Sequence, residues 1–364
     1  MNRMEERLRA AISKDGPITL DQYMAVALTD QEDGYYTRGD GIGATGDFIT
    51  APEISQMFGE LIGLWMADMW QRMGAPKETV IAELGPGRGT LMADALRAMR
   101  RAAPELVQSA SLRLVEASPV LRRMQTERLA EFSPGFVDDF DELPDRPMLL
   151  VANEFLDALP IRQLVKRGKG WAERAVGVGA EHLEFVEIDP PMPVPGGLPP
   201  MAEGEIMEIS PSRLFVAGEV AEHVTAHGGA ALFIDYGHGL TAPGDTLQAM
   251  KGHAFHSLLE TPGEADITSH VDFAAAADMA EDLGATVHGP IGQRQFLLRL
   301  GIEARLAQLL KGATPDAAEG LTAGFRRLTD PQHMGHLFKV MCLSHPEIGT
   351  PTGYVAEEAY STGP

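Results

Sequence analysis

The chain has 364 residues, of which 44% are hydrophobic and 23% charged, a composition typical of a globular protein with a sizeable core. Its 52 acidic and 30 basic residues give a net charge of -22, and a surface this negative repels phosphate backbones, which argues against nonspecific nucleic-acid binding. The single cysteine, Cys342, excludes an internal disulfide, and no apolar run approaches the roughly 20 residues of a membrane span, so we expect a cytoplasmic protein. The excess of acid suits solubility and would also attract a cationic substrate, such as a protein that bears arginine or lysine.

The first 78 residues are predicted to form a helical and glycine-rich extension that covers a cleft. Residues 1–30 follow a helical pattern that breaks at Pro17. Glycines then punctuate residues 34–53, which indicates a long loop. Apolar residues with helical spacing predict one continuous helix over 52–72.

Strands and helices alternate most clearly in residues 79–160. The predicted strands span 80–84, 112–116, 136–137 and 148–153, and the predicted helices span 90–102 and 119–132. A β-α-β series of this kind implies a parallel sheet with helices on both of its faces. Residues 79–160 are therefore predicted to be the first part of an α/β core.

The alternation stops in residues 161–228, which are predicted to be an inserted β-rich segment. The stretches 161–165, 172–178 and 183–188 alternate like strands with no helix between them, which indicates an antiparallel sheet. A proline-rich loop follows, and a helix over 211–225 ends the insertion.

Residues 229–345 are predicted to complete the core. A strand is predicted over 230–237, helices over 271–283, 293–310 and 315–328, and a final strand over 338–343. The remaining residues, 346–364, show no periodicity and are predicted to be a mobile tail.

The candidate cofactor-binding segment is the turn that follows the first core strand. Ligands of open α/β sheets bind beyond the carboxyl ends of the strands, where glycines let the backbone approach them. Dinucleotide-binding turns have the pattern G-x-G-x-x-G, whereas the spacing here is G-x-G-x-G. The preceding carboxylate would repel a pyrophosphate, but it would suit the ammonium group of S-adenosylmethionine, directly or through the loop backbone. The candidates are Glu83, Gly85, Gly87 and Gly89, with a nucleotide or a turn that binds nothing as alternatives.

The next two strands end in acidic residues that are candidates for the nucleoside part of this cofactor. Glu116 ends the second strand, where a carboxylate can accept hydrogen bonds from both ribose hydroxyls. Asp138 and Asp139 follow the third strand, where a carboxylate can meet the adenine amino group. We favour Asp139 slightly.

The fourth strand ends at the place where the transferred methyl group is expected. Asn153 is predicted to bind the cofactor there, and Glu154 and Asp157 are predicted to be catalytic. The N-terminal loop contributes two further catalytic candidates, Asp47 and Glu53. A polar cap on the strand, without a catalytic role, is the alternative for the fourth strand.

Other chemistries are less consistent with the sequence. The His, Asp and Glu positions lack a compact metal-ligand spacing, so no metal is predicted. The G-x-S-x-G elbow of α/β hydrolases is absent as well.

These segments together resemble the MidA-like methyltransferases. The matching segments are 34–36, 46–53, 58–60, 83–90, 115–119, 152–160, 235–237, 266–273 and 295–297. They lie in order between Gly34 and Arg305, and the departures at Ala51, Leu156 and Ser269 leave the acidic positions intact.

The resemblance implies an α/β, Rossmann-like class I S-adenosylmethionine-dependent methyltransferase fold, with an N-terminal helical and loop extension and an inserted antiparallel β subdomain. The family includes a mitochondrial assembly factor that methylates an arginine of the 49-kDa subunit of respiratory complex I. The resemblance therefore implies a protein arginine N-methyltransferase that forms symmetric dimethylarginine on a homologue of that subunit. The mitochondrial members carry an import sequence, which residues 1–10 do not resemble, so a bacterial member is expected.

Three alternatives remain open at this level. The chain could methylate another protein or a small molecule, or it could be an assembly chaperone that keeps a cofactor pocket. A nucleotide-binding oxidoreductase is the third alternative. The oligomeric state is not readable from the sequence.

Overall fold

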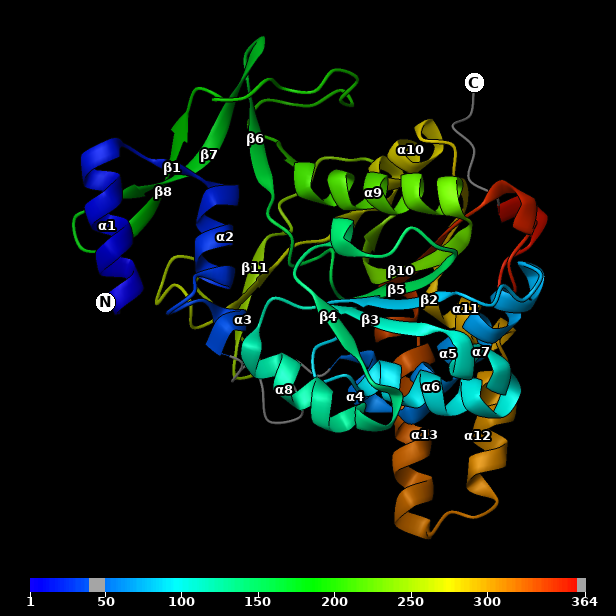
Figure 1. The fold of residues 1–364 in the computed structure, drawn as a ribbon. Helices are drawn as coiled ribbons and strands as arrows, with labels where there is room; N and C mark the ends of the chain where they lie inside the picture. Colours follow the sequence, from blue (N-terminus) through cyan, green and yellow to red (C-terminus); the bar gives the residue numbers. More distant parts are fainter. Residues whose placement is uncertain (39–49, 359–364) are drawn as a thin grey trace. The chain divides into compact units, whose positions relative to one another are not determined.

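The structure, a computed structural model, describes residues 1–38 and 50–358 (Figure 1). The chain forms two compact units that interleave along the sequence, and we describe each by itself. Unit 1 comprises residues 1–48, 157–215 and 240–270, and unit 2 comprises residues 49–156, 216–239 and 271–364.

Unit 2 is built on an eight-stranded mixed sheet with the strand order β15-β16-β10-β5-β2-β3-β4, and β14 pairs with β10 off this path. The strands are β2 (Val80–Leu84), β3 (Ser111–Val115), β4 (Gly135–Val137), β5 (Met148–Asn153), β10 (Gly229–His238), β14 (Val271–Asp272), β15 (Thr286–Gly292) and β16 (Phe338–Ser344). The strands from β4 to β10 run parallel, whereas β16 pairs antiparallel with β10 and with β15. The carboxyl ends of β2, β3 and β5 therefore lie together at one end of the sheet, its carboxyl edge.

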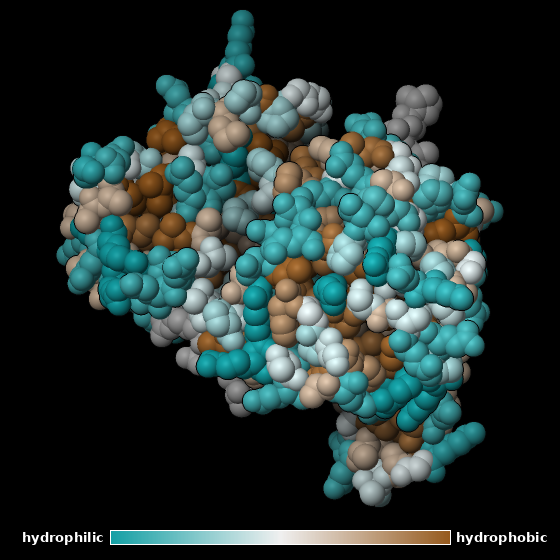
Figure 2. All heavy atoms as spheres, in the orientation of Figure 1, coloured by the Kyte–Doolittle hydropathy of each residue, from teal (hydrophilic) through white to brown (hydrophobic). Residues whose placement is uncertain are grey.

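Helices cover both faces of this sheet. The helices are α4 (Ala51–Ile54), α5 (Gln56–Arg72), α6 (Thr90–Ala102), α7 (Pro104–Ser109), α8 (Pro119–Arg128), α9 (Pro211–His227), α10 (Phe273–Asp282), α11 (Gln293–Arg299), α12 (Ile302–Leu310), α13 (Pro315–Thr329) and α14 (Met334–Leu337). Of these, α12 and α13 pack against other helices. Figure 1 shows α9 and α10 on one face and α5 and α6 on the other. Strands β2, β5 and β10 are buried along nearly their whole length, which is why each reads as a continuous apolar run. Hydrophilic residues cover most of the face of unit 2 that Figure 2 shows.

Two glycines let α5 pack closely against α6. A Cβ added at Gly63 would lie 2.3 Å from the carbonyl oxygen and 2.6 Å from the Cα of Ala95 on α6. A Cβ at Gly59 would lie 2.7 Å from the Cβ of Asp94. Since α6 begins directly after the glycine-rich turn, this contact also fixes the position of the turn.

The close approach of α5 and α6 leads to a stability prediction. Because backbone atoms of Ala95 block the added methyl group, Gly63→Ala should force the helices apart and lower the free energy of unfolding by about 1–3 kcal/mol. Gly320→Ala is the matched control, since Gly320 lies on α13 with no atom within 4 Å of its added Cβ. The control should be stabilising by roughly 0.5–1 kcal/mol. Chemical unfolding measures both changes, and equal effects would contradict the packing argument.

In the residues that the structure describes, unit 1 combines two small antiparallel sheets with helices near the N-terminus. In the five-stranded sheet the order is β1-β7-β6-β9 with β8 on β7, and in the three-stranded sheet it is β12-β11-β13. The elements are α1 (Arg3–Asp15), α2 (Leu20–Thr29), α3 (Tyr35–Arg38), β1 (Ile18–Thr19), β6 (Arg162–Arg167), β7 (Gly170–Val178), β8 (Leu183–Ile188), β9 (Ile206–Ile209), β11 (Gln248–Lys251), β12 (Ala254–His256) and β13 (Asp266–Thr268). Its own apolar core joins Met24, Ile161, Val176 and Ile267.

The α/β core and the antiparallel insertion predicted from the sequence are both confirmed. The predicted strands 80–84 and 148–153 and the predicted helix 90–102 agree with β2, β5 and α6 residue for residue. The predicted domain boundaries stay a prediction. The compact units divide the chain at other points, because residues 49–78 pack within unit 2.

Three predicted helices were wrong in where they begin or break. The helix predicted over 52–72 is two helices, because Ser55 is extended and its hydroxyl accepts from Met57 N as the cap of α5. The helix predicted over 293–310 breaks at Gly301, whose φ is 89°. The helix predicted over 271–283 begins at Phe273, after the short strand β14.

The mobility predicted for the tail stays a prediction. As far as residue 358, the tail contains the short 3-10 turns η3 (Pro346–Ile348) and η4 (Ala356–Glu358). Tyr354 is buried in the unit 2 core, with its ring centroid 5.6 Å from that of Phe296. None of the helices in the described part of the chain is long and apolar enough to cross a membrane.

Candidate active site

The glycine-rich turn lies at the carboxyl end of the central strand β2. Gly85, Gly87 and Gly89 have φ values of 59°, 52° and 73°, a region that favours glycine over residues with a side chain. A Cβ at Gly85 would also lie 2.7 Å from Cδ2 of Phe155. Gly89 N donates to Pro86 O at 2.8 Å and caps α6. The turn therefore presents bare backbone at the sheet edge where ligands of such folds bind.

Three buried polar oxygen atoms near the glycine-rich turn and the strand ends beside it have no hydrogen-bond partner among the described residues. They are Oε2 of Glu83 on β2, Oδ1 of Asn153 at the end of the neighbouring strand β5, and Oε1 of Gln125 on α8. Burial, and then the nearby charge of Glu116, raise the pKa of Glu83 to about 8. Because buried polar groups are normally hydrogen-bonded, these atoms fit a ligand that brings donors and positive charge, as the ammonium group of S-adenosylmethionine does.

Glu116 is held in one orientation at the end of β3. Its Oε1 accepts from Ser118 N at 2.8 Å, and its Oε2 accepts from Nε2 of Gln125 at 3.0 Å. The same Nε2 donates to Gly87 O at 2.7 Å. Burial raises the pKa of Glu116, while its hydrogen bonds oppose that rise. Each carboxylate oxygen keeps a further lone pair for a ligand hydroxyl.

Gln125 is a residue that sequence reasoning missed. It is fully buried on α8, a helix with few other buried side chains, and it ties the glycine-rich turn to Glu116. No local pattern marks it. A glutamine in a helix is ordinary, and only the packing of α8 against the turn shows its role.

The two aspartates after β4 lie at the surface. Asp138 forms an ion pair with Arg122 at 2.7 Å, whose side chain also donates to Glu116 O at 2.5 Å and to Val137 O at 2.9 Å. Asp139 is exposed and precedes the 3-10 turn η2 (Phe140–Glu142). The prediction that Asp139 meets the adenine stays a prediction.

Glu154 has an unusual backbone conformation directly after β5. Its φ is 51°, which costs a residue with a side chain of order 1–3 kcal/mol. Its backbone N–H donates to Ile234 O of β10 at 2.9 Å. Its Oε1 accepts from Ala51 N at 2.9 Å and from Nδ2 of Asn153 at 3.1 Å. The surrounding strands and helix therefore hold this carboxylate in place against a local strain, a combination that is frequent at active sites.

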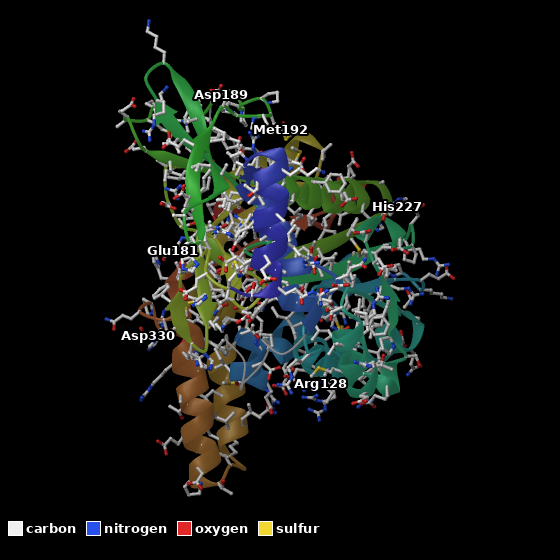
Figure 3. All side chains as sticks on the ribbon, turned by 90° about the vertical axis from the view of Figure 1, so that its left-hand side faces the viewer. Arg128, Glu181, Asp189, Met192, His227 and Asp330 are labelled. Atoms are coloured by element: carbon white, nitrogen blue, oxygen red, sulfur yellow. The ribbon has the colours of Figure 1, made fainter. Side chains whose placement is uncertain are left out.

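Of the two acids predicted from the N-terminal loop, the structure describes Glu53. Glu53 lies on α4 and accepts from the hydroxyl of Thr90, the first residue of α6. Arg128 of α8, labelled in Figure 3, lies 3.9 Å from the same carboxylate. Glu53 thus contacts the start of the helix that follows the glycine-rich turn, and its catalytic role stays a prediction. Asp47 lies outside the described residues.

Asp157 belongs to unit 1, where it is buried close to Tyr36 and Asp266. Tyr36 donates to Oδ1 of Asp266 at 2.7 Å. Burial, followed by the charges of Asp266 and Asp157, raises the pKa of Tyr36 well above its usual value. Arg213 donates to the backbone oxygen of Asp157 at 3.0 Å. Asn153 and Glu154 therefore meet in unit 2, and within unit 1 Asp157 lies close to Tyr36 and Asp266.

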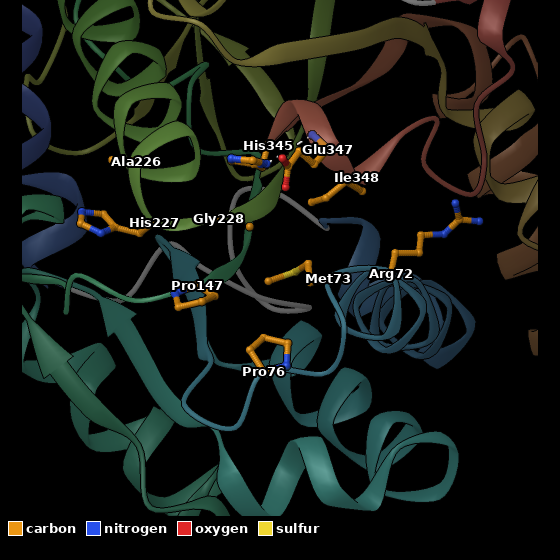
Figure 4. A pocket seen from close by; sticks show the side chains of 11 residues that line it. Arg72, Met73, Pro76, Pro147, Ala226, His227, Gly228, His345, Glu347 and Ile348 are labelled. Carbon is orange, nitrogen blue, oxygen red and sulfur yellow. Dashed lines mark hydrogen bonds between the residues drawn. The ribbon is translucent and has the colours of Figure 1, made fainter.

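A pocket of about 400 Å³ lies at the opposite, amino-terminal ends of the unit 2 strands (Figure 4). Pro147 and Gly228, which directly precede β5 and β10, line it together with Pro76, His227 and His345. It is therefore not the candidate cofactor site.

Comparison with known proteins identifies the family. Residues 61–291 match the model of a family of S-adenosyl-L-methionine-dependent methyltransferases. The chain belongs to this methyltransferase family. Its relatives include the mitochondrial protein arginine methyltransferase NDUFAF7 of Mus musculus and the NDUFAF7 homologue of Drosophila melanogaster. Each is 36% identical to this chain, and each match covers 93% of this chain and 84% of the relative.

Solved structures agree with this assignment. A superfamily member from Burkholderia thailandensis bound to S-adenosyl-homocysteine matches with a TM-score of 0.82 and 28% identity, over 98% of this chain and 95% of that chain. A native crystal structure of a protein of the same superfamily from that organism matches with a TM-score of 0.80 at the same identity and coverage. The predicted class I methyltransferase fold, the S-adenosylmethionine cofactor and the MidA-like family are confirmed. The protein is an S-adenosylmethionine-dependent methyltransferase.

The buried Glu83 of this methyltransferase leads to a stability prediction. Its pKa is about 8 in the folded protein against 4.5 when exposed, so the fold favours the protonated form. The stability that it contributes is fully present below pH 4.5 and is lost as the pH rises towards 8. Glu83→Gln carries no charge at any pH. We therefore expect this change to raise the melting temperature of the cofactor-free protein near pH 8 and to leave it almost unchanged near pH 5.

Scanning fluorimetry at the two pH values measures this difference. Glu319→Gln, at an exposed position on α13, is the matched control and should change the melting temperature at neither pH. A gain in Glu83→Gln that is the same near pH 5 and near pH 8 would contradict the pKa argument.

Proposed function

We propose that this methyltransferase is a protein arginine N-methyltransferase that forms symmetric dimethylarginine on a homologue of the 49-kDa subunit of respiratory complex I. The observation that carries the proposal is the Glu154 carboxylate, which is held in a strained position at the end of β5 beside the orphaned oxygen of Asn153. The names of the relatives, protein arginine methyltransferases, support the choice of acceptor. The net charge of -22 suits a cationic substrate.

We assign the cofactor to the carboxyl edge of the unit 2 sheet. Glu83 and Asn153 would accept from its ammonium group, and Glu116 would accept from the ribose hydroxyls. The glycines of the turn, Gly85, Gly87 and Gly89, would let the cofactor approach the backbone closely. Asp139 would accept a hydrogen bond from the adenine amino group. The bound cofactor supplies an electrophilic methyl group on a sulfonium centre.

The acceptor chemistry needs a carboxylate. A guanidinium is charged at every physiological pH and is a poor nucleophile. A carboxylate can fix the plane of the guanidinium through two parallel hydrogen bonds, and it can receive the proton that leaves the nitrogen as the new N–C bond forms. We assign the acceptance of the proton to Glu154, whose Oε1 is held by hydrogen bonds from Ala51 N and from the Asn153 amide. Asp157, Asp47 and Glu53 are the further catalytic candidates.

Two other functions remain as alternatives within the same fold. The protein could methylate another protein or a small molecule, or it could bind S-adenosylmethionine as an assembly chaperone. The cytoplasm stays the compartment predicted from the sequence. A conservative change at Glu154 distinguishes an enzyme from a chaperone, because only the enzyme depends on the proton acceptor.

Glu154→Gln should lower the methylation rate constant by about 100-fold or more, since the amide cannot receive a proton. The amide oxygen can still accept from Ala51 N, so the affinity for the cofactor should change little. Label transfer from radioactive S-adenosylmethionine to the purified 49-kDa subunit homologue, followed by amino-acid analysis for symmetric dimethylarginine, is the measurement. The exposed Glu319→Gln should keep full activity.

Two results of this assay, and one measurement in cells, would each decide between the alternatives. No label in the subunit homologue, with cofactor binding intact, would overturn the arginine proposal. Full activity in Glu154→Gln would overturn the role of Glu154. Loss of methylation with complex I assembly retained in cells would favour the chaperone.

A separate prediction concerns the proton on Glu83. If the cofactor ammonium pairs with this carboxylate, its binding at neutral pH displaces the proton that the raised pKa of about 8 retains. Calorimetry in buffers of different ionisation enthalpy should therefore show proton release with the wild-type protein and none with Glu83→Gln. The variant should also bind the cofactor about 10- to 100-fold more weakly, because it loses a charged hydrogen bond. Equal proton release by both proteins would contradict the pairing.

A further inference from the structure

A cluster of potential metal ligands lies at the end of the unit 2 sheet opposite to the glycine-rich turn. One ligand atom from each of Asp145, His223 and His227 lies within 4.8 Å of the others, and among the described residues this cluster alone has that geometry. Asp145 is exposed before β5, and His223 and His227 stand one helical turn apart on α9. The cluster plays no part in the proposed methyl transfer.

The β5–β10 pairing brings these three residues together. Met148 N donates to Gly228 O at 3.1 Å, and Met148 and Gly229 are partners in the parallel register. The segment before β5 therefore runs beside the end of α9. Nε2 of His227 lies 3.5 Å from Oδ1 of Asp145, and Figure 3 shows His227 at the outer end of α9.

A hydrogen bond of the His223 ring leaves its other nitrogen as a potential metal ligand. Its Nε2 lies 2.9 Å from the backbone oxygen of Arg146. A carbonyl oxygen can only accept, so Nε2 carries the proton and Nδ1 keeps its lone pair. The edge of Phe140 packs on the ring, with 5.8 Å between centroids. Histidine ligands of metals usually donate their second N–H to a carbonyl or carboxylate in this way.

Acidic residues also flank the histidines of the cluster on α9. Glu222 directly precedes His223, and Glu219 lies one helical turn before it. Arg146, the basic residue that follows Asp145 in the chain, lies 3.7 Å from Glu78. The two imidazoles of the cluster are 4.9 Å apart between centroids, so one ion can be reached from both rings.

We propose that Asp145, His223 and His227 bind a first-row transition-metal ion of the Zn²⁺ class. Two imidazole nitrogens and one carboxylate oxygen match the ligand preferences of Zn²⁺, Co²⁺, Ni²⁺ and Cu²⁺. A three-residue set leaves the remaining coordination positions to water. The ion would join the end of α9 to the segment before β5, so binding stabilises the folded protein. This inference departs from the prediction of no metal, which rested on sequence spacing alone.

Chelator-treated full-length protein titrated with CoCl₂ and with ZnCl₂ tests the proposal. We expect one ion per chain by calorimetry, visible absorption bands with Co²⁺, and a higher melting temperature with Zn²⁺. Asp145→Asn, His227→Gln and His223→Gln should each lose the Co²⁺ bands and the shift in melting temperature. The glutamine at position 223 can still donate to the Arg146 carbonyl, so loss of folding is not expected there.

His336→Ala is the matched control, because His336 is exposed on α14 and lies outside the cluster. It should keep the metal response in full. The proposal is overturned if the wild-type protein shows no saturable binding of one ion, or if His227→Gln binds as the wild-type protein does. The affinity for the cofactor should be equal in all of these variants. Loss of metal binding would therefore leave the proposed arginine methyltransferase activity untouched, and the reverse also holds.

Discussion

The parallel pairing of β5 with β10 is the constraint on which both ends of the unit 2 sheet depend. It requires a glycine at its start, because a Cβ at Gly229 would lie 2.2 Å from Met148 O. At the carboxyl end, the same pairing positions Glu154, whose N–H donates to Ile234 O of β10. At the amino end it places Asp145 beside the end of α9. One backbone register therefore organises the candidate active site and the candidate metal site.

The candidate active site is assembled at a cost in stability. Glu83 is a carboxyl buried where its charge is unfavourable, and Glu154 adopts a backbone conformation that side chains disfavour. Asn153 leaves a buried oxygen without a donor among the described residues. Each of these costs falls if a cationic, donor-rich ligand arrives, because that ligand supplies the missing charge and hydrogen bonds. Features that destabilise the cofactor-free protein are thus the ones that fit the methyltransferase activity.

Elements that local sequence patterns determine were predicted accurately, whereas elements that depend on contacts between distant residues were not. Strands β2 and β5 were predicted to the residue, because parallel strands buried on both faces are continuous apolar runs. The helix expected over 52–72 was wrong at Ser55, because its apolar spacing continues across a residue that is extended and caps a new helix. The strand β15 was missed, because a glycine and a proline interrupt its pattern and its pairing partner β16 lies far along the chain.

The sequence by itself determined the cofactor class and the turn that receives the cofactor. Both depend on residues close to one another in the chain, because the glycine spacing sets the conformation of the turn and Glu83 lies just before it. The tertiary structure alone decided which distant residues support that turn and which do not. Gln125 joins Glu116 to Gly87, and Asp145 joins two histidines of α9. The physical reason is that hydrogen bonds and ligand sets depend on distances of a few ångströms between segments far apart in the chain, and only the packing of the fold sets those distances.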